Sequence, residues 1–502
     1  MIDWRGDIVN KTIGISKRDV YQYPSKNYNF RPSKAYPEYP FEEAKISPEE
    51  NETYEMVRDA FFLQGLDKEN YGSNNWNPLG QYVSPGNKVV IKPNMVMDFN
   101  PTGDGTDCLY THPSVVAAVV DYVVIALRGR GEIIVGDAPM QECNFEKLIE
   151  DSGYKQLIEY YRNEFENSKI EISLKDFRGY TSRFINGVHY GDENANTARG
   201  ILVELGENSA FSNYSVEQLE RLRINSYDPS ILKTHHNSSK HEYLVNGDIL
   251  SADVIINMPK PKTHRKAGVT IALKNLVGIN VRKEYLPHHL NGSSRDGGDE
   301  YNNANVFKSI KSRLQDDINI AEHQKKFKKA KLLIFLRKVM TSFIRFSADQ
   351  SWDGSWYGNE TISKTIGDLN SIIFFCDKKG KLRDEKQRNY FIVADMIVSG
   401  ENEGPIEPTR KEAGLIAVGE DPVCFDEVIA TIMGFDIKKI PTLCQMRQNQ
   451  RKMMITECDS QAIIVSNYSN WNNKKINELS REELMGFIPA VGWRNHIEMN
   501  DR

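Results

Sequence analysis

Apolar and polar positions alternate along residues 88–165 with two periods, one typical of strands and one of helices. An apolar run ends at Pro93, and the next helical pattern begins with a proline, which is common at the first position of a helix. Strand, helix, strand and helix in this order predict parallel pairing. The expected elements are strand 88–94, helix 113–127, strand 131–137 and helix 145–165.

The same rhythm returns after residue 360, and a strand and a helix are also expected before residue 88. The pattern does not predict the topology of residues 168–250, where short strand-like runs alternate with polar loops. The sequence therefore predicts an α/β fold with a mostly parallel, three-layer sheet core and insertions. The further elements are an edge strand at 12–16, helix 47–63, strands 170–174 and 200–205, helix 363–375, strands 390–398 and 414–418, helix 422–433 and strand 462–465.

A chain of 502 residues exceeds what one hydrophobic core usually serves, so we expect two lobes with additions. A Tyr- and Pro-rich arm comes first, and a Gly/Ser/Asn linker composition opens the insertion. The expected division is 1–87 for the arm and its helices, 88–290 for a first α/β lobe, 291–360 for the insertion, and 361–502 for a second α/β lobe and tail.

Composition narrows the functional classes. With 64 basic and 69 acidic residues the chain has no global positive field, so a nucleic-acid partner is not expected. The six cysteines form no Cys-x-x-Cys pair, so no iron–sulfur cluster is expected. The amino terminus lacks a basic segment followed by an apolar one, and no apolar run is long enough to span a membrane, so we expect a cytoplasmic protein.

The segment Asp253–His264 carries the strongest chemical signal. An apolar strand ends there in a run of polar side chains, and in α/β proteins ligands bind at the carboxyl ends of such strands. Pro261 keeps the two flanking lysines in an extended backbone, where both point to one face and can hold one anion. A solvated surface loop is the alternative. The residues assigned to the site are Asn257, Lys260, Lys262, Thr263 and His264.

Other strand ends and helix starts add candidates of the same kind. Lys92 and Asn94 flank Pro93 at the end of a strand, and Lys274 and Asn275 lie on a helix expected to begin within 269–278. We expect these four, with Asn257, Lys260 and Thr263, to bind substrate. The alternative is that they cap strand ends or remain solvated.

Histidines and carboxylates near the same strand ends predict catalysis and a metal. His112 precedes a helix, where it can cap the helix or contact a ligand. We expect His264, His112 and Lys262 to be catalytic. Imidazole with carboxylate suits a divalent metal, and the expected ligands are Asp137, Asp395 and His288. Asp137 is equally suited to a turn.

A basic amphipathic helix is expected at 321–346. Apolar residues lie on one side of it and lysines and arginines around them, a pattern that can bind an anionic membrane surface or a protein partner. The alternative is that its apolar side packs on its own domain.

Several of these blocks together resemble the domain-of-unknown-function family numbered 362, over residues 88–435. The blocks are Lys92-Pro-Asn94, Thr111-His-Pro113, Gly136-Asp137, Asp253–His264, Val269–Gly278, Gly404-Pro405 and Asp421-Pro422 with Asp426. The resemblance implies an α/β core and no assigned activity. Some members resemble fusions to a ferredoxin module, which this chain lacks. The arm and the 291–360 insertion would mark a longer subgroup.

Two functional hypotheses follow. The first is a metal-assisted enzyme for an anionic, possibly phosphorylated, small molecule or conjugate, in which the lysines hold the anion and His264 or His112 is the base or a ligand. The second is a noncatalytic anion- or metal-binding protein that docks to a partner or membrane through 321–346. Redox catalysis by nickel or iron is a third.

Overall fold

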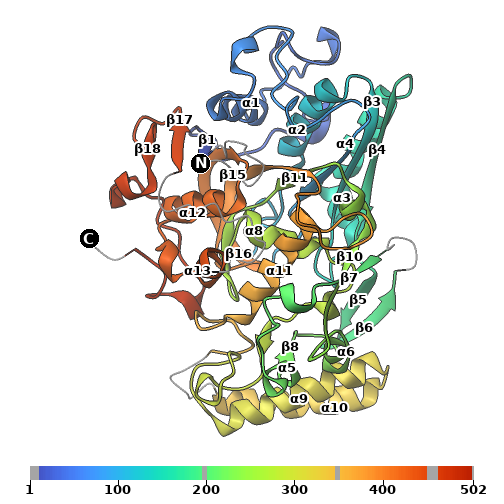
Figure 1. Ribbon diagram of the computed structural model, residues 1–502, viewed down its shortest axis with the longest axis vertical. Helices are drawn as coiled ribbons and strands as arrows, with labels where there is room; N and C mark the ends of the chain where they lie inside the picture. Colours follow the sequence, from blue (N-terminus) through green and yellow to red (C-terminus); the bar gives the residue numbers. More distant parts are fainter. Residues whose placement is uncertain (1–10, 195–199, 345–350, 449–461, 500–502) are drawn as a thin grey trace.

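The computed structural model describes residues 11–194, 200–344, 351–448 and 462–499. Within them, one sheet of 11 strands forms the centre of the protein, in the order β18-β17-β1-β16-β15-β11-β2-β3-β4, with β12 and β13 joined beside β15 (Figure 1). The strands are β1 Thr12–Lys17, β2 Lys88–Pro93, β3 Arg130–Asp137, β4 Lys169–Asp176, β11 Val254–Met258, β12 Lys262–His264, β13 Gly268–Thr270, β15 Asn389–Glu403, β16 Glu407–Gly419, β17 Ile463–Ser466 and β18 Lys474–Lys475.

Helices cover both faces of this sheet. Successive residues of a strand point to opposite faces, so Val89 and Ile91 join one buried apolar cluster and Val90 joins the other. Helices α1 Glu52–Gln64, α2 Pro113–Leu127, α3 Phe145–Ser152 and α4 Tyr154–Glu164 contribute to the first cluster. Helices α8 Ala272–Asn275, α11 Thr361–Phe375, α12 Pro422–Met433 and α13 Pro441–Gln448 contribute to the second. The prediction of a three-layer, mostly parallel α/β core is confirmed.

Local chemistry accounts for the helix ends. His112 caps α2 and Pro113 follows it, and Asp421 caps α12 through the amides of Val423 and Cys424. The helix expected over 145–165 is two helices, because Gly153 between them has a left-handed backbone with φ 94°.

Segments distant in sequence share the central sheet. β1, from the amino-terminal arm, pairs antiparallel with β16 and parallel with β17. β11 pairs parallel with β15, so the sheet runs without interruption from 88–290 into 361–502. The arm thus contributes an interior strand, and the expectation of an edge strand is wrong, because β16 and β17 pair with its two sides.

Smaller elements surround the carboxyl end of the sheet. They include a β5–β6 hairpin and the β7-β10-β9 and β14-β8 pairings. Their bounds are β5 Tyr180–Ile185, β6 Val188–Glu193, β7 Gly200–Glu204, α5 Val216–Glu220, β8 Leu222–Arg223, α6 Pro229–His235, β9 His236–Asn237, β10 Lys240–Asn246, α7 Gly247–Ser251 and β14 His289–Leu290.

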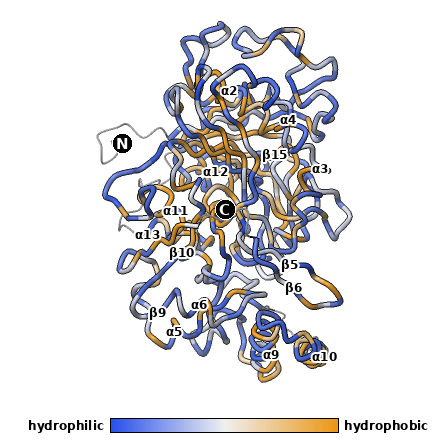
Figure 2. The backbone as a smooth tube through the Cα atoms, turned by 90° about the vertical axis from the view of Figure 1, so that its right-hand side faces the viewer, coloured by the Kyte–Doolittle hydropathy of each residue, from blue (hydrophilic) through white to orange (hydrophobic). Residues whose placement is uncertain are grey.

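The basic helix expected at 321–346 is not one continuous helix. α9 spans Val306–His323, and α10 spans Phe327–Ile344; residues 345 and 346 lie outside the described part of the chain. Lys325, between the two helices, has a left-handed backbone with φ 56°, which reverses the chain. The two helices lie side by side at one end of the molecule, next to β6 (Figures 1 and 2).

Candidate functional site

The order of strands reverses between β2 and β11. From β2 the sheet continues to β3 and β4, with connecting helices on one face, whereas from β11 it continues to β15, with α8 and α11 on the other. The connections that follow β2 and β11 go to opposite faces of the sheet at this point. They leave a crevice beyond the carboxyl ends of the two strands, where α/β proteins bind ligands.

A cavity of about 720 Å³ occupies this position. Asn94 follows β2, Asp137 ends β3, His264 ends β12, and Asn275 ends α8; all four line the cavity. Its polar lining also includes Lys266, Thr270, Lys274, Lys283, His288 and Asp353.

Three lysines and Arg265 line the cavity and give it its positive charge. Lys283 donates from Nζ to the carbonyl of Pro139 at 2.6 Å, and Lys266 donates to the carbonyl of Asp353. Within the described residues, Lys274 Nζ has neither a hydrogen bond nor a carboxylate at ion-pair distance. Of the three lysines, Lys274 is therefore the one left to bind a ligand, and Arg265 Nε in the same lining also has no hydrogen-bond partner among the described residues.

Burial and mutual repulsion weaken the charge on these lysines. Burial, with the positive charges of Lys283 and Lys92, lowers the pKa of Lys274 to about 7. Burial also lowers the pKa of Lys283 to about 8. A bound anion would favour the charged form of both side chains, so the cavity gains from taking up negative charge.

His264 is held as a neutral hydrogen-bond donor. Its Nδ1 accepts hydrogen bonds from the backbone amides of Lys266 and Ala267, at 3.0 and 3.1 Å. Burial and the charges of Lys274 and Arg265 hold its pKa well below the usual value. The proton of the neutral ring must therefore lie on Nε2. His264 offers an N–H group and not the lone pair of a base.

His288 has the opposite arrangement. Its Nδ1 lies 2.8 Å from the carbonyl of Leu286, an atom that can only accept, so Nδ1 carries the proton. Burial and the charge of Lys266 hold the pKa of His288 well below the usual value, which keeps the ring neutral. Nε2 of His288 is thus a lone pair in the cavity that contains the His264 N–H.

A buried polar network forms the wall behind the cavity. Lys92 Nζ donates to Asp137 Oδ1 at 2.7 Å and to Asn275 Oδ1 at 3.3 Å. Asn275 donates to Asn257 Oδ1 at 2.7 Å and accepts from Asn94 Nδ2 at 3.0 Å. The structure brings together these five predicted residues, but it uses Lys92 and Asn257 to position the wall and not to line the cavity.

Lys262 is buried behind the same wall and contacts it through a hydrogen bond to Asn94. Its Nζ donates to Asn94 Oδ1 at 2.8 Å and to the carbonyl of Leu109. The side chain is fully buried, and burial, with the charges of Lys260 and Lys274, lowers its pKa to about 7. Lys262 does not line the cavity, so its contact with the site is through Asn94.

Lys260 belongs to a second buried cluster. Its Nζ donates to Asp395 Oδ2 at 2.7 Å and to the Tyr23 hydroxyl at 2.6 Å, whereas Lys262 points to Asn94. The expectation that the ammonium groups of Lys260 and Lys262 converge on one anion is therefore wrong. Lys260 and Lys262, on either side of Pro261, donate hydrogen bonds to different partners.

His112 also lies in this second cluster. Its Nδ1 accepts from the Ser114 amide at 3.2 Å, and its ring stacks on Tyr23 with centroids 3.9 Å apart. Phe30 covers another side of the ring at 5.4 Å. His112 is absent from the lining of the cavity, and the contacts it makes are those of a helix cap.

The three expected metal ligands do not come together. Asp137 accepts from Lys92 and from the amides of Met95 and Ala138. Asp395 accepts from Tyr23, Lys260 and the His112 amide. Among residues the structure describes, no three His, Cys, Asp or Glu side chains are grouped so as to hold a metal ion.

Thr263, expected to bind substrate, donates to the carbonyl of Asn402 at 2.9 Å and does not line the cavity.

Comparison with known proteins identifies the family of this chain. The family model described as Domain of unknown function (DUF362) matches residues 89–173 and 172–431. The chain belongs to the DUF362 family. All predicted site residues, from Lys92 to Asp395, fall within the matched DUF362 region.

One curated relative is Thylakoid-associated protein sll1697 of Synechocystis sp. (strain ATCC 27184 / PCC 6803 / Kazusa). It is 25% identical over 200 residues, which are 40% of this chain and 41% of the relative, so the match spans less than half of either protein. No solved structure matches the chain. Within the described residues of this DUF362 protein, no helix is long and apolar enough to cross a membrane.

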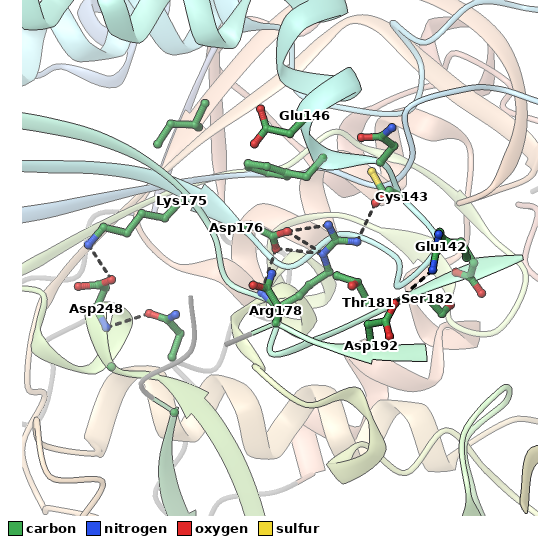
Figure 3. Close-up of a pocket in the computed structure, with 18 of the residues that line it drawn as sticks. Glu142, Cys143, Glu146, Lys175, Asp176, Arg178, Thr181, Ser182, Asp192 and Asp248 are labelled. Carbon is green, nitrogen blue, oxygen red and sulfur yellow. Dashed lines mark hydrogen bonds and ion pairs between the residues drawn. The ribbon is translucent and has the colours of Figure 1, made fainter. Parts of the chain in front are cut away.

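A larger cavity of about 1540 Å³ lies beside the carboxyl end of β4 in the DUF362 region, between the β5–β6 hairpin, α3 and α7. Figure 3 shows Arg178 beside Asp176 and Lys175 beside Asp248 in its lining. Arg178 contacts both oxygens of Asp176, the closest at 2.6 Å, and Lys175 contacts Asp248 at 2.9 Å. These cations are already neutralised, so the smaller cavity is the better anion site.

Sequence reasoning missed Lys266 and Lys283, and both line the smaller cavity. Lys266 lies two residues after His264 in the same strand-end loop, so that loop was a usable signal. Lys283 follows no strand and no motif. Its position beside Pro139 depends on how 276–285 folds back over the end of β3.

Proposed function

We propose that this DUF362 protein is an enzyme that acts on a small molecule bearing a phosphate or carboxylate group. The observation that supports this most is the pair of histidines with opposite polarity in one cavity that also contains Lys274. A volume of about 720 Å³ suits a small-molecule ligand.

In this proposal the anionic group binds beside Lys274, with Lys266 and Lys283 adding positive charge. The His264 N–H then donates to an oxygen on which negative charge develops, a role in which a fixed donor is effective. In the same step His288 Nε2 accepts a proton from the substrate, and the electron pair left behind is the negative charge that develops on that oxygen. Binding of the anion offsets the lysine charge that lowers the His288 pKa, so the ring becomes a stronger base once substrate is present.

Sulfate binding tests the anion site, because sulfate stays a dianion across the relevant pH range. We expect Lys274→Met to weaken sulfate binding about tenfold at pH 6, measured by calorimetry. In the native protein the affinity should fall as pH rises through about 7, where Lys274 loses its proton. Lys378→Met, at an exposed lysine, is the control and should bind as the native protein does. Equal affinity in all three proteins would rule out Lys274 as the anion ligand.

Turnover separates an enzyme from a binding protein. The native protein and His288→Ala are each incubated with the small-molecule fraction of a bacterial extract, and consumption is followed by mass spectrometry. We expect the native protein alone to consume an anionic compound, while both proteins bind sulfate. Retention of a compound without consumption by either protein would favour the noncatalytic anion-binding alternative.

Elemental analysis of the purified protein tests the divalent metal that the sequence predicts. No step proposed above uses a metal, because Asp137 and Asp395 are engaged by other residues. The name of the Synechocystis relative describes it as thylakoid-associated. For this chain it supports the proposal that a surface separate from the cavity contacts a membrane.

A further inference from the structure

The outward face of α10 carries a row of exposed apolar side chains. Leu332, Phe335 and Phe343 are 61%, 63% and 51% exposed, although large apolar residues are usually buried. We call the apolar stripe the five exposed residues spaced three or four apart along this helix, which places them on one face. They are Leu332, Phe335, Leu336, Val339 and Phe343.

The apolar stripe is not the face of α10 that packs against the rest of the protein. Ala330, Ile334 and Ile344 are buried on the inner side, and Ile334 packs with Val188 and Ile318. The helix therefore has a second apolar face, most of which its own fold leaves exposed. α9 extends this face, because Phe307 stacks on Phe343 at 5.2 Å between ring centroids.

Lysines border the stripe on both sides. At 100° per residue, Lys329 lies next to one edge of the stripe, Lys331 and Lys338 lie next to the other, and Lys328 falls within its arc, one turn before Leu332; all four are exposed. Residues 325–344 contain no Asp or Glu, although the whole chain is slightly acidic. Within the described residues of α9 and α10, Asp317 on α9 is the one exposed carboxylate.

We propose that the apolar stripe and its lysines bind the surface of an anionic lipid bilayer. Such a surface provides one sign of charge on both sides of an inserted helix, which matches lysines on both borders. A protein groove would need carboxylates placed along both walls. The apolar side chains would enter the acyl boundary, and the lysines would contact lipid headgroups. The position of α9 and α10 at one end of the molecule leaves the stripe accessible (Figures 1 and 2).

Sedimentation with lipid vesicles tests this proposal with the full-length protein. We expect binding to vesicles containing phosphatidylglycerol and little binding to phosphatidylcholine alone. Replacement of Lys329, Lys331 and Lys338 by Glu should weaken binding at least about 100-fold, because each basic residue near an anionic surface contributes about 1 kcal/mol. Leu332→Ser combined with Phe335→Ser should weaken it comparably, through lost insertion.

Control variants change equally exposed side chains elsewhere. Val216→Ser and Val491→Ser remove apolar groups that are 65% and 58% exposed, and Lys378→Glu with Lys379→Glu changes charge away from α10. These variants should bind vesicles as the native protein does, and unchanged thermal melting shows that each variant is folded. The proposal is overturned if the native protein ignores anionic vesicles or if the stripe variants bind normally. Self-association that the stripe variants abolish, without vesicle binding, would assign the surface to a second copy instead.

Discussion

At the scale of single residues, each lysine of the site is defined by its partner. Lys92 has a carboxylate, Lys262 has only an amide and a carbonyl oxygen, and Lys274 has neither. In the sequence all three lie at or near the ends of strands or short helices. Their roles differ because a buried charge must be paired or lose its proton, whereas a cavity leaves room for an outside anion.

Gly278 allows the Lys92–Asp137 pair to approach the cavity wall. A Cβ at this position would lie 1.9 Å from Asp137 Oδ1 and 2.9 Å from Lys92 Nζ. Both side chains are buried, so Gly278→Ala must displace the pair. We expect a loss of about 3 kcal/mol in the free energy of unfolding, measured by urea denaturation.

Gly72→Ala is the control for this substitution. Its Cβ would meet no atom within 4 Å, and its φ of 79° strains the backbone alone. We expect a loss of about 1 kcal/mol. If both variants lose the same amount, the close approach to Asp137 is not what requires glycine at 278.

At the scale of elements, the site residues lie at the carboxyl ends of parallel strands. The amino-terminal arm packs on the neighbouring buried cluster that contains Lys260 and Asp395. Tyr23 from the arm donates to Asp395 Oδ1 at 2.6 Å and accepts from Lys260 Nζ at 2.6 Å and from the Val398 amide at 3.1 Å. The arm thereby completes a buried ion pair contributed by the loop after β11 and by β15.

Removal of the Tyr23 hydroxyl should destabilise the protein. Tyr23→Phe leaves the buried groups of Lys260 and Asp395 each short of a hydrogen bond, which typically costs about 1–3 kcal/mol. Tyr21→Phe is the matched control, since that hydroxyl makes an exposed contact to Asp19. Its effect on the free energy of unfolding should be below about 0.5 kcal/mol. Equal effects would show that the arm does not stabilise the pair.

At the scale of the whole molecule, burial of lysines without carboxylates makes stability depend on pH. The pKa of Lys262 is about 7 in the folded protein, below the ordinary value near 10.5. Between these values the unfolded chain binds a proton that the folded chain does not. Stability contributed by this residue therefore rises with pH through this window, by up to about 1.4 kcal/mol per pH unit.

Comparison with Lys262→Met isolates this effect, because the other titrating groups are common to both proteins. From pH 7 to 9.5, the free energy of unfolding of the native protein should rise by about 3 kcal/mol relative to the variant, measured by urea denaturation. Lys378→Met, at an exposed lysine, should show no such change. A pH-independent difference for Lys262→Met would mean that Lys262 is charged in the fold throughout this range.

The sequence alone determined the α/β class, the family, and the strand ends that carry the site, because these follow from local periodicity, proline positions and residue type. Five residues that the sequence predicted for the site lie in one hydrogen-bonded group: Lys92, Asn94, Asp137, Asn257 and Asn275. Only the tertiary structure decided which side chains face the cavity, since that depends on partners remote in the chain. Lys260 is bound by Tyr23 and Asp395 in a separate buried cluster. His112 contacts Ser114 and Tyr23 and does not line the cavity. Lys283 lines the cavity although it belongs to no sequence motif.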